Sequence, residues 1–295
     1  MKPKVIITIV LVLVAGIIFV AVKNTLPTPK PIVEVKTNEP IYKIIGTSVE
    51  GRKIESYTFL PDDGQAGGNG TTTHLAFVGG VHGGYEWNSV LLAYQFIDHL
   101  SATSTVIPKN LTITVIPTAN PDGLFKVVGK EGRFVAADAS VNETTLASGR
   151  FNARGVDLNR NFDCKWQPEA TWRSQKVGAG TAAFSEPEAM AIKNFVLNNK
   201  PTAVVFWHSQ ANAVYASECQ AGVLPQTLAI MNAYAKAAGY AAVPAFTAYP
   251  VTGDAEGWLA SINIPAITVE LKTHETIEWE QNLAGIKALF NYYSK

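Results

Sequence analysis

Residues 74–100 read HLAFVGGVHGGYEWNSVLLAYQFIDHL and contain the features that predict the fold. Their first part, His74–Val78, is mostly apolar and leads into two glycines, as is typical of a buried strand. Residues Trp87–Leu100 have apolar positions at three- and four-residue spacing, which indicates a helix. The segment between these two patterns carries His82 and Glu86. A buried strand that leads into a helix is a building unit of α/β domains.

The alternation of strand and helix patterns continues to the end of the chain. Further strands are expected at Leu111–Ile116, Ala203–Trp207 and Ala266–Leu271. Further helices are expected from a capping box at Ser185, over Pro225–Ala238 and over Ile277–Tyr293, and a long surface loop over residues 129–154. We therefore expect one α/β domain at residues 41–295, with a mixed, mainly parallel central sheet and helices on both faces.

Residues 5–22 form an uncharged apolar run, VIITIVLVLVAGIIFVAV, which Lys2 and Lys4 precede. A run of this length can span a bilayer core, and the lysines favour a cytoplasmic start. We therefore expect residues 1–4 in the cytoplasm, one transmembrane signal anchor at 5–22, a Pro-rich spacer at 23–40 and an extracytoplasmic domain at the cell membrane. A signal peptide whose cleavage releases a secreted protein is one alternative, and a buried core helix is another.

The composition excludes several classes of protein. The chain has 295 residues, of which 47% are hydrophobic, and this share is too high for a disordered chain. Its 24 basic and 24 acidic residues balance, so it lacks the positive charge of a nucleic-acid-binding protein. We expect a monomer that has no nucleic-acid partner and that contacts the membrane through its N-terminal helix.

Two histidines stand where predicted strands end. His82 follows one strand pattern and His208 directly follows another, and ligands of open α/β sheets bind beyond such carboxyl ends. Glu86 and Glu270 are placed to reach the same edge of the sheet. Two histidines and one carboxylate form a common catalytic zinc site, and a further glutamate can act as the general base. His274, in a polar stretch, is expected at the surface.

Several longer motifs make the chain similar to a known family. They are IIGTSVEGRKI (44–54), GGVHGGYE (79–86), NPDG (120–123), RGVDLNRNF (154–162), FSEPEA (184–189), WHSQ (207–210), the stretch from Tyr249 to Trp258, and TVEL (268–271). With these motifs in this order, the chain resembles the zinc carboxypeptidases of the carboxypeptidase A family. It looks like a short bacterial-type member without a pro-region. The resemblance implies that the protein is a metallocarboxypeptidase.

The resemblance assigns the metal chemistry to four residues. His82, Glu86 and His208 match the ligands of one Zn²⁺ ion, and Glu270 matches the general base that activates the zinc-bound water. The family's usual metal motif is His-x-x-Glu, whereas here Glu86 is the fourth residue after His82. Both spacings put two side chains on one side of a turn, so ligation by Glu86 is still expected.

Other matched residues concern the substrate. Asn159 and Arg160 match the pair that binds the terminal carboxylate of a peptide, for which a planar guanidinium group is well suited. Tyr249 matches a phenol that covers the bound substrate. A second arginine is expected to polarise the scissile carbonyl group. Arg150 fits this role best, and Arg154 is the alternative.

One further position concerns the residue that is removed. In the family, the selectivity residue lies two positions before the tryptophan that ends the tyrosine stretch, which is Trp258 here. That position holds Glu256, and an acidic group there resembles the members that remove Lys or Arg. Basic or amino-bearing C-terminal residues are therefore expected. The alternatives are that Glu256 is a solvated loop residue or that Asp254 has this role.

The expected function is hydrolysis of the C-terminal bond of peptides that have a free carboxylate. A zinc-dependent deacylase or amidase that acts on small acyl-amino acids or cell-wall peptides is a second hypothesis. An inactive extracytoplasmic binding domain is a third.

The two cysteines are expected near the same cleft. Cys164 lies four residues after Arg160, and Cys219 lies eleven residues after His208. A disulfide between them is expected in an oxidising compartment, and two separate buried thiols are the alternative.

Overall fold

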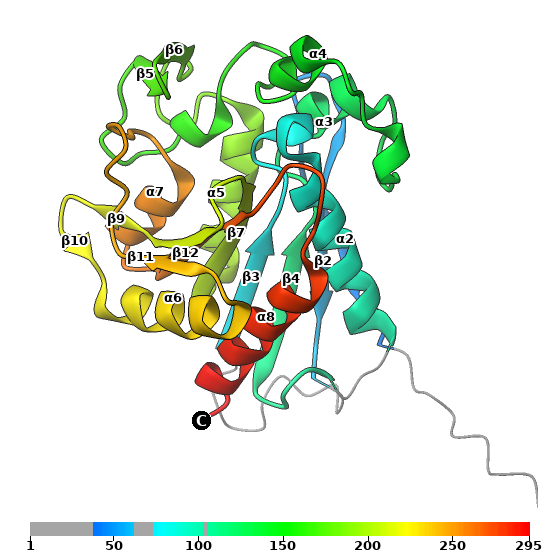
Figure 1. Cartoon of the computed structure of the whole chain (residues 1–295), viewed down its shortest axis with the longest axis vertical. Coiled ribbons are helices and arrows are strands. Elements are labelled where there is room, and N and C mark those ends of the chain that lie inside the picture. Colours follow the sequence, from blue (N-terminus) through cyan, green and yellow to red (C-terminus); the bar gives the residue numbers. More distant parts are fainter. Residues whose placement is uncertain (1–37, 62–72, 103–105) are drawn as a thin grey trace, which may run out of the picture. The chain divides into compact units, whose positions relative to one another are not determined.

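The computed structural model of the chain describes residues 38–61, 73–102 and 106–295 (Figure 1). All of them belong to one structural unit, Lys36–Lys295. The expected signal anchor at 5–22, and all but the last residues of the expected spacer, lie outside the described residues. In the part of the chain that is described, no helix is both long enough and apolar enough to cross a membrane.

A mixed eight-stranded sheet is the centre of the fold. Its strands are, in spatial order, β1 (Ile41–Thr47), β2 (Lys53–Phe59), β4 (Leu111–Ile116), β3 (Thr73–Val78), β7 (Ala203–Ser209), β12 (Ala266–Leu271), β8 (Ala213–Ala216) and β11 (Ala241–Val243). The inner strands β4, β3, β7 and β12 run parallel to one another, and β8 and β11 also form a parallel pair. The pairs β1–β2, β2–β4 and β8–β12 are antiparallel.

Helices cover both faces of this sheet, as predicted. They are α2 (Trp87–Ala102), α3 (Pro121–Val128), α4 (Glu143–Ser148), α5 (Pro187–Asn199), α6 (Pro225–Ala238), α7 (Ala255–Ser261) and α8 (Trp279–Tyr293). One apolar core contains side chains of α2, α6 and α8, and a second core contains side chains of α5 and α7. Figure 1 shows α6 and α8 in front of the sheet and α5 behind it.

Strand β7 shows how one run of residues serves both cores. All of its residues are buried, and successive side chains of a strand point to opposite faces. Val205 and Trp207 accordingly lie in the core that includes α2, whereas Val204 and Phe206 lie in the core that includes α5. A central parallel strand that is buried on both faces therefore has a continuous apolar sequence.

The predicted elements agree with the observed ones at the centre of the sheet and less well at its edges. Strands β4 and β12 and helix α6 have the predicted bounds. Gly239 ends α6 in the left-handed conformation, with φ 74°. The edge strands β1 and β11 are not predicted, because β1 is largely exposed and β11 has only three residues.

The start of α5 differs from the expected capping box. Its N-cap residue is Glu186, and no side chain caps the helix. Ser185 Oγ instead donates to Glu186 Oε1 (2.9 Å) and accepts from the N–H of Thr181 (3.2 Å). The predicted capping by Ser185 is therefore wrong, because this hydroxyl group holds the turn that precedes the helix. Pro187 does occupy the first turn, where its missing N–H has no cost.

The expected surface loop at 129–154 is only partly exposed. It contains the short 3₁₀ helix η3 (Ala136–Asp138) and helix α4. Near its end, Arg150 and Asn152 are buried, with 3% and 0% exposure. Asn152 Nδ2 donates to Glu186 Oε2 (2.8 Å), which fixes this end of the loop to the start of α5.

Cys164 and Cys219 form a disulfide in the structure, with Cα atoms 6.0 Å apart. The bond joins the segment after the 3₁₀ helix η4 (Leu158–Arg160) to strand β9 (Glu218–Cys219), which pairs with β10 (Gly222–Val223). It links residues that are 55 positions apart in the sequence. Cys164 follows closely on η4, which carries the candidate site residues Asn159 and Arg160.

Candidate active site

The turn between β3 and α2 holds two of the candidate metal ligands. His82 precedes the 3₁₀ turn η1 (Gly83–Glu86), which continues directly into α2. Gly83 adopts φ 46°, and a Cβ atom there would lie 2.6 Å from the carbonyl oxygen of Gly149. Glycine is the residue that suits this close approach. The turn buries His82 and Glu86, which are 4% and 3% exposed.

The parallel strands β7 and β12 position His208 and Glu270. These two residues are direct partners in the strand register, so their side chains leave the sheet on the same face. His208 is only 2% exposed, whereas Glu270 is partly exposed. The ends of β7 and β12 therefore bring His208, the third candidate metal ligand, and Glu270, the candidate base, to one edge of the sheet.

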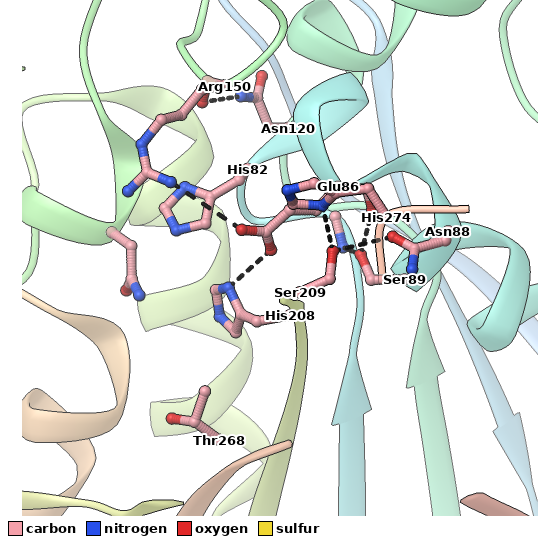
Figure 2. Close-up of polar contacts among 12 residues, drawn as sticks. His82, Glu86, Asn88, Ser89, Asn120, Arg150, His208, Ser209, Thr268 and His274 are labelled. Carbon is pink, nitrogen blue, oxygen red and sulfur yellow. Dashed lines mark hydrogen bonds and ion pairs between the residues drawn. The ribbon is translucent and has the colours of Figure 1, made fainter. Parts of the chain in front are cut away.

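The structure brings His82, Glu86 and His208 together in one cluster (Figure 2). Each residue offers one ligand atom such that all of these atoms lie within 4.8 Å of one another. His208 Nδ1 is 3.0 Å from Glu86 Oε2, and the two imidazole centroids are 4.9 Å apart. The longer His-x-x-x-Glu spacing is therefore compatible with a three-residue site.

Each histidine of the cluster has a second buried carboxylate beside it. Asp157 Oδ1 lies 3.4 Å from His82 Nδ1, and Glu256 Oε1 lies 3.2 Å from His208 Nε2. Carboxylates in such positions orient imidazoles that bind a metal. Asp157 is not among the predicted site residues, although its place in the motif DLNRNF could have indicated it.

The electrostatics of the cluster favour a bound cation. Burial lowers the pKa of His208, but the carboxylates of Glu86 and Glu256 outweigh burial and raise this pKa well above its usual value. Burial lowers the pKa of His82 well below its usual value. Burial and the charge of Glu86 raise the pKa of Glu270 to about 8. The carboxylates thus favour a positive charge at His208, and a bound cation in place of the proton would satisfy the same carboxylates.

The residues of the cluster fit zinc. Among the described residues, Glu270 Oε2 is buried beside the cluster without a hydrogen-bond partner. Two imidazoles and one carboxylate are the protein ligands of many catalytic zinc sites, which keep a further position open. His82, Glu86 and His208 would hold the ion, and its charge would compensate the neighbouring carboxylates.

Of the two candidate arginines, Arg150 lies beside the cluster. Its Nη2 is 2.8 Å from Asp157 Oδ2, and its Nη1 is 3.9 Å from Glu86 Oε1. The side chain of Arg154 is 56% exposed and pairs with Glu186 at 3.5 Å. The geometry therefore favours Arg150 for contact with a substrate carbonyl group.

Asn159 and Arg160 lie in η4, close to the start of α7. Asn159 Oδ1 accepts a hydrogen bond from the N–H of Ala255 (2.8 Å). Arg160 donates from Nη1 to the carbonyl of Asn159 (2.6 Å) and from Nε to the carbonyl of Thr171 (3.1 Å). Within the described part of the chain, Nη2 of Arg160 makes no hydrogen bond. This guanidinium group is buried, with 3% exposure, and keeps one edge without a hydrogen bond.

Glu256 is buried in the first turn of α7 and is not a solvated loop residue. It is 3% exposed and accepts a hydrogen bond from Thr268 Oγ1 (3.1 Å). Asp254 has a different task, because its carboxylate caps α7 by accepting from the N–H of Gly257 (2.7 Å). Of these two acids, Glu256 is the one that contacts both Thr268 and His208.

Tyr249 lies in the loop between β11 and α7. Its ring packs edge-on against Phe246 at 4.9 Å, and Phe246 packs against Tyr215 of β8 at 5.7 Å. Burial raises the pKa of Tyr215, and the charge of Glu270 adds to this effect. The described contacts thus place Tyr249 in a row of aromatic rings beside the site and not among the metal ligands.

The expectation that His274 lies at the surface is wrong. Its Nδ1 is 2.7 Å from Ser209 Oγ, and its ring lies 4.8 Å from that of Tyr85. Ser209 Oγ also donates to Asn88 Oδ1 (3.0 Å), as Figure 2 shows. Asn88 Nδ2 in turn donates to the carbonyl of Thr273 (2.7 Å), so the loop after β12 is fixed to α2 and β7.

This network is a part of the site that the sequence analysis does not include. Tyr85 and Ser209 directly precede and follow the metal-ligand candidates Glu86 and His208. The position of His274, four residues after Glu270, is the signal that could have indicated it.

An α/β sheet with a buried His/Glu/His cluster and a neighbouring glutamate at its carboxyl edge defines a metal-dependent hydrolase. A model of the family described as "Zinc carboxypeptidase" matches residues 34–284. The chain belongs to this family of zinc-dependent hydrolases.

Individual relatives agree with this assignment. The gamma-D-glutamyl-L-diamino acid endopeptidase 1 of Lysinibacillus sphaericus is 24% identical over 169 residues, which are 54% of this chain and 42% of that protein. Carboxypeptidase B of Canis lupus familiaris is 28% identical over 250 residues, which are 77% of this chain and 57% of that protein. The match thus spans about half the length of these two relatives.

A solved structure shows the same fold. The murein-tripeptide amidase MpaA of Escherichia coli O157 has a TM-score of 0.59 and 22% sequence identity, and the match covers 92% of this chain and 98% of that chain.

Proposed function

We propose that the protein is a metallocarboxypeptidase that hydrolyses the C-terminal bond of peptides with a free carboxylate. One observation carries this proposal: His82, Glu86 and His208 form one cluster, and Glu270 is the register partner of His208. All residue types that this reaction needs are present and close together. An inactive binding domain would be expected to lack at least one of them.

The roles of the residues follow from their positions. When bound, zinc polarises a carbonyl oxygen and makes water more acidic. Glu270, whose Oε2 has no hydrogen-bond partner among the described residues, accepts a proton from the attacking water and delivers it to the departing amine. Arg150, held by Asp157, stabilises the negative charge that develops on the carbonyl oxygen. Arg160 binds the terminal carboxylate and so selects the last peptide bond.

The residue that leaves is proposed to carry an amino group in its side chain. The support is the buried carboxylate of Glu256, which lies between Thr268 and His208. A cationic side chain that reaches this carboxylate would be favoured, and an acidic side chain would be repelled.

The experiment is an assay of the purified full chain with acetylated tripeptides that end in lysine. We expect release of free lysine, its loss on treatment with a zinc chelator and its recovery when zinc is added. Cleavage at internal bonds only, or activity that survives removal of the metal, would contradict the proposal.

A cell-wall amidase is a second candidate function, and it shares the leaving group. The names of two relatives specify a diamino acid and a murein tripeptide, and a diamino acid also presents an amino group to Glu256. Peptides that contain a γ-D-glutamyl bond to lysine or to diaminopimelate distinguish the two functions. Faster hydrolysis of this bond than of the matched α-linked bond would favour the amidase.

We also propose that residues 5–22 anchor the protein in the cell membrane and that the catalytic domain is extracytoplasmic. The support is the length of the apolar run and the disulfide of Cys164 and Cys219, which is typical of oxidising compartments. Fractionation tests this directly. Recovery of the intact chain in the soluble fraction would contradict the anchor, whereas recovery of a chain shortened at its N-terminus would indicate signal cleavage.

A further inference from the structure

Arg150, which is proposed to stabilise the charge on the substrate carbonyl, is held along one edge of its guanidinium group. Its Nε donates to Asp157 Oδ2 (2.9 Å), and its Nη2 lies 2.8 Å from the same oxygen. Its Nη1 makes no hydrogen bond among the described residues and lies 3.9 Å from Glu86 Oε1. Figure 2 shows the guanidinium group directed toward Glu86. Nη1 is therefore the part of this group that remains for a substrate.

One face of the same guanidinium group is covered by an indole ring. Trp172, at the end of strand β5 (Glu169–Trp172), is half-buried, and its ring centroid lies 4.3 Å from Cζ of Arg150. Arginine is attracted to an aromatic face, and more strongly where both groups are withdrawn from water. The two contacts with Asp157 share one oxygen, so they leave the guanidinium plane free to tilt about it. The indole ring removes this freedom.

The indole ring is itself held on the side of the site. It packs edge-on against the Tyr85 ring at 5.2 Å, and Tyr85 directly precedes Glu86 in η1. The residue before Trp172 contacts the other arginine of the site, because the Thr171 carbonyl accepts from Arg160 Nε (3.1 Å). Two adjacent residues of β5 thus contact both arginines that are proposed to bind the substrate.

The hairpin that carries Trp172 is fixed to the segment that carries Asp157. Strand β5 pairs with β6 (Gln175–Gly178), and the carbonyl of Gly178 accepts from the N–H of Asp157 (2.9 Å). Val156 also forms a β-bridge with Gly178. The two groups that hold Arg150, the Asp157 carboxylate at its edge and the Trp172 ring at its face, therefore belong to segments that are hydrogen-bonded to each other.

We propose that Trp172 is a positioning residue, whose ring fixes the tilt of the Arg150 guanidinium group so that Nη1 faces the scissile carbonyl group. This inference rests on the proposed function, which gives Arg150 its role. Trp172 acts through Arg150 and not by contact with the reacting atoms. Because Arg150 acts on charge that develops in the transition state, a misplaced guanidinium group lowers kcat more than it raises KM.

Kinetics of the full chain carrying Trp172→Leu test the proposal, with α-linked and γ-D-glutamyl peptides that end in lysine. Leucine is apolar but has no aromatic face. We expect kcat to fall about ten-fold, with KM within about two-fold of wild type and with wild-type zinc content. Trp172→Phe keeps an aromatic face and should retain most of kcat. In the Arg150→Gln background, Trp172→Leu should change kcat by less than about two-fold, because no guanidinium group is left to position.

Trp166→Leu is the matched control. Trp166 packs against the same small apolar cluster as Trp172, and its ring contacts no cation among the described residues. This variant should keep the wild-type kcat even where it lowers Tm. An equal loss of kcat in Trp166→Leu and Trp172→Leu would overturn the proposal, because the loss would then come from a loosened hairpin. A ten-fold effect of Trp172→Leu that persists in Arg150→Gln would also overturn it.

A readout that needs no turnover separates this proposal from the proposed function. NMR spectra of arginine side chains record the Nε–H group of Arg150, which is assigned by its absence from Arg150→Gln. Because an aromatic ring shifts the signals of groups above its face, Trp172→Leu should move this signal and Trp166→Leu should not. An unmoved signal in Trp172→Leu would overturn the proposal. A moved signal in a chain that hydrolyses neither kind of peptide would contradict the proposed function and support the placement of Arg150 by Trp172.

Discussion

At the scale of single residues, Glu270 is placed to act as a base because one of its carboxylate oxygens is free to accept a proton. Its Oε2 makes no hydrogen bond within the described part of the chain. Glu270→Gln keeps the shape of the side chain but cannot accept a proton. We expect kcat to fall by about 100-fold or more, with zinc content and Tm at wild-type values. A variant with nearly normal kcat would remove Glu270 from this role.

Glu256 has two neighbours that imply different roles. The hydrogen bond from Thr268 holds the Glu256 carboxylate on the proposed side of the leaving residue. The contact with His208 makes Glu256 a neighbour of a candidate metal ligand. For the selectivity role, we expect wild-type kcat/KM to favour a peptide ending in lysine over one ending in phenylalanine. Glu256→Gln should erase most of this preference, because the carboxylate that attracts the cation is lost.

The control for this prediction is Asp254→Asn, which retains the preference if the capping role of Asp254 is its only one. A wild-type preference for phenylalanine would reject the selectivity role of Glu256. Loss of zinc from Glu256→Gln at an unchanged preference would show that Glu256 mainly orients His208.

The cluster of His82, Glu86 and His208 could be predicted from the sequence, whereas the contacts of its supporting residues could not. His82, Glu86 and His208 stand where strands and turns end, so their type and place both indicate a site. Asp157 and Ser209 acquire their roles only through contacts between segments that are far apart in the chain. Such contacts have no periodic signal in the sequence.

At the scale of structural elements, the network of Asn88, Ser209 and His274 connects α2, β7 and the loop after β12. Because Ser209 follows His208 directly, loss of its hydroxyl group should loosen the ligand. We expect Ser209→Ala to weaken zinc binding by roughly ten-fold, the lower end of the range for residues that support metal ligands. Competition with a chromogenic chelator measures this affinity.

Ser209→Thr is the matched control, because it retains the hydroxyl group and should keep most of the affinity. The Tm of the metal-free protein separates a local effect from general destabilisation. Equal zinc affinity in Ser209→Ala and wild type would show that the network does not position His208.

The bounds of the strands could be predicted from the sequence where most of their residues are buried. β4 and β12 are rich in apolar and β-branched residues, and their predicted bounds are correct. β1 and β11 are edge strands with exposed residues, so neither apolar runs nor strict alternation mark them. The capping box at Ser185 fails because the hydroxyl group has a tertiary partner, Asn161 Nδ2, at 3.0 Å, and tertiary contacts override local capping preferences.

At the scale of the whole molecule, the disulfide of Cys164 and Cys219 closes a segment that contains α5 and β7. The double variant Cys164→Ser, Cys219→Ser should lower the free energy of unfolding by about 2–4 kcal/mol, because the unfolded chain loses a constraint. Denaturant titration of the metal-free protein measures this difference without the contribution of zinc. An unchanged free energy of unfolding, or two free thiols in protein from an oxidising compartment, would contradict the structural role of the bond.

The central claim is that His82, Glu86 and His208 form one zinc site, and metal analysis of single variants tests it most directly. The measurement is the number of zinc ions per chain in wild type, Glu86→Ala, His208→Ala and, as a control histidine in α2, His99→Gln. The account predicts one zinc ion per chain in wild type and in His99→Gln. It predicts loss of zinc and of peptidase activity together in Glu86→Ala and in His208→Ala. Full zinc occupancy in either of these two variants would contradict the account.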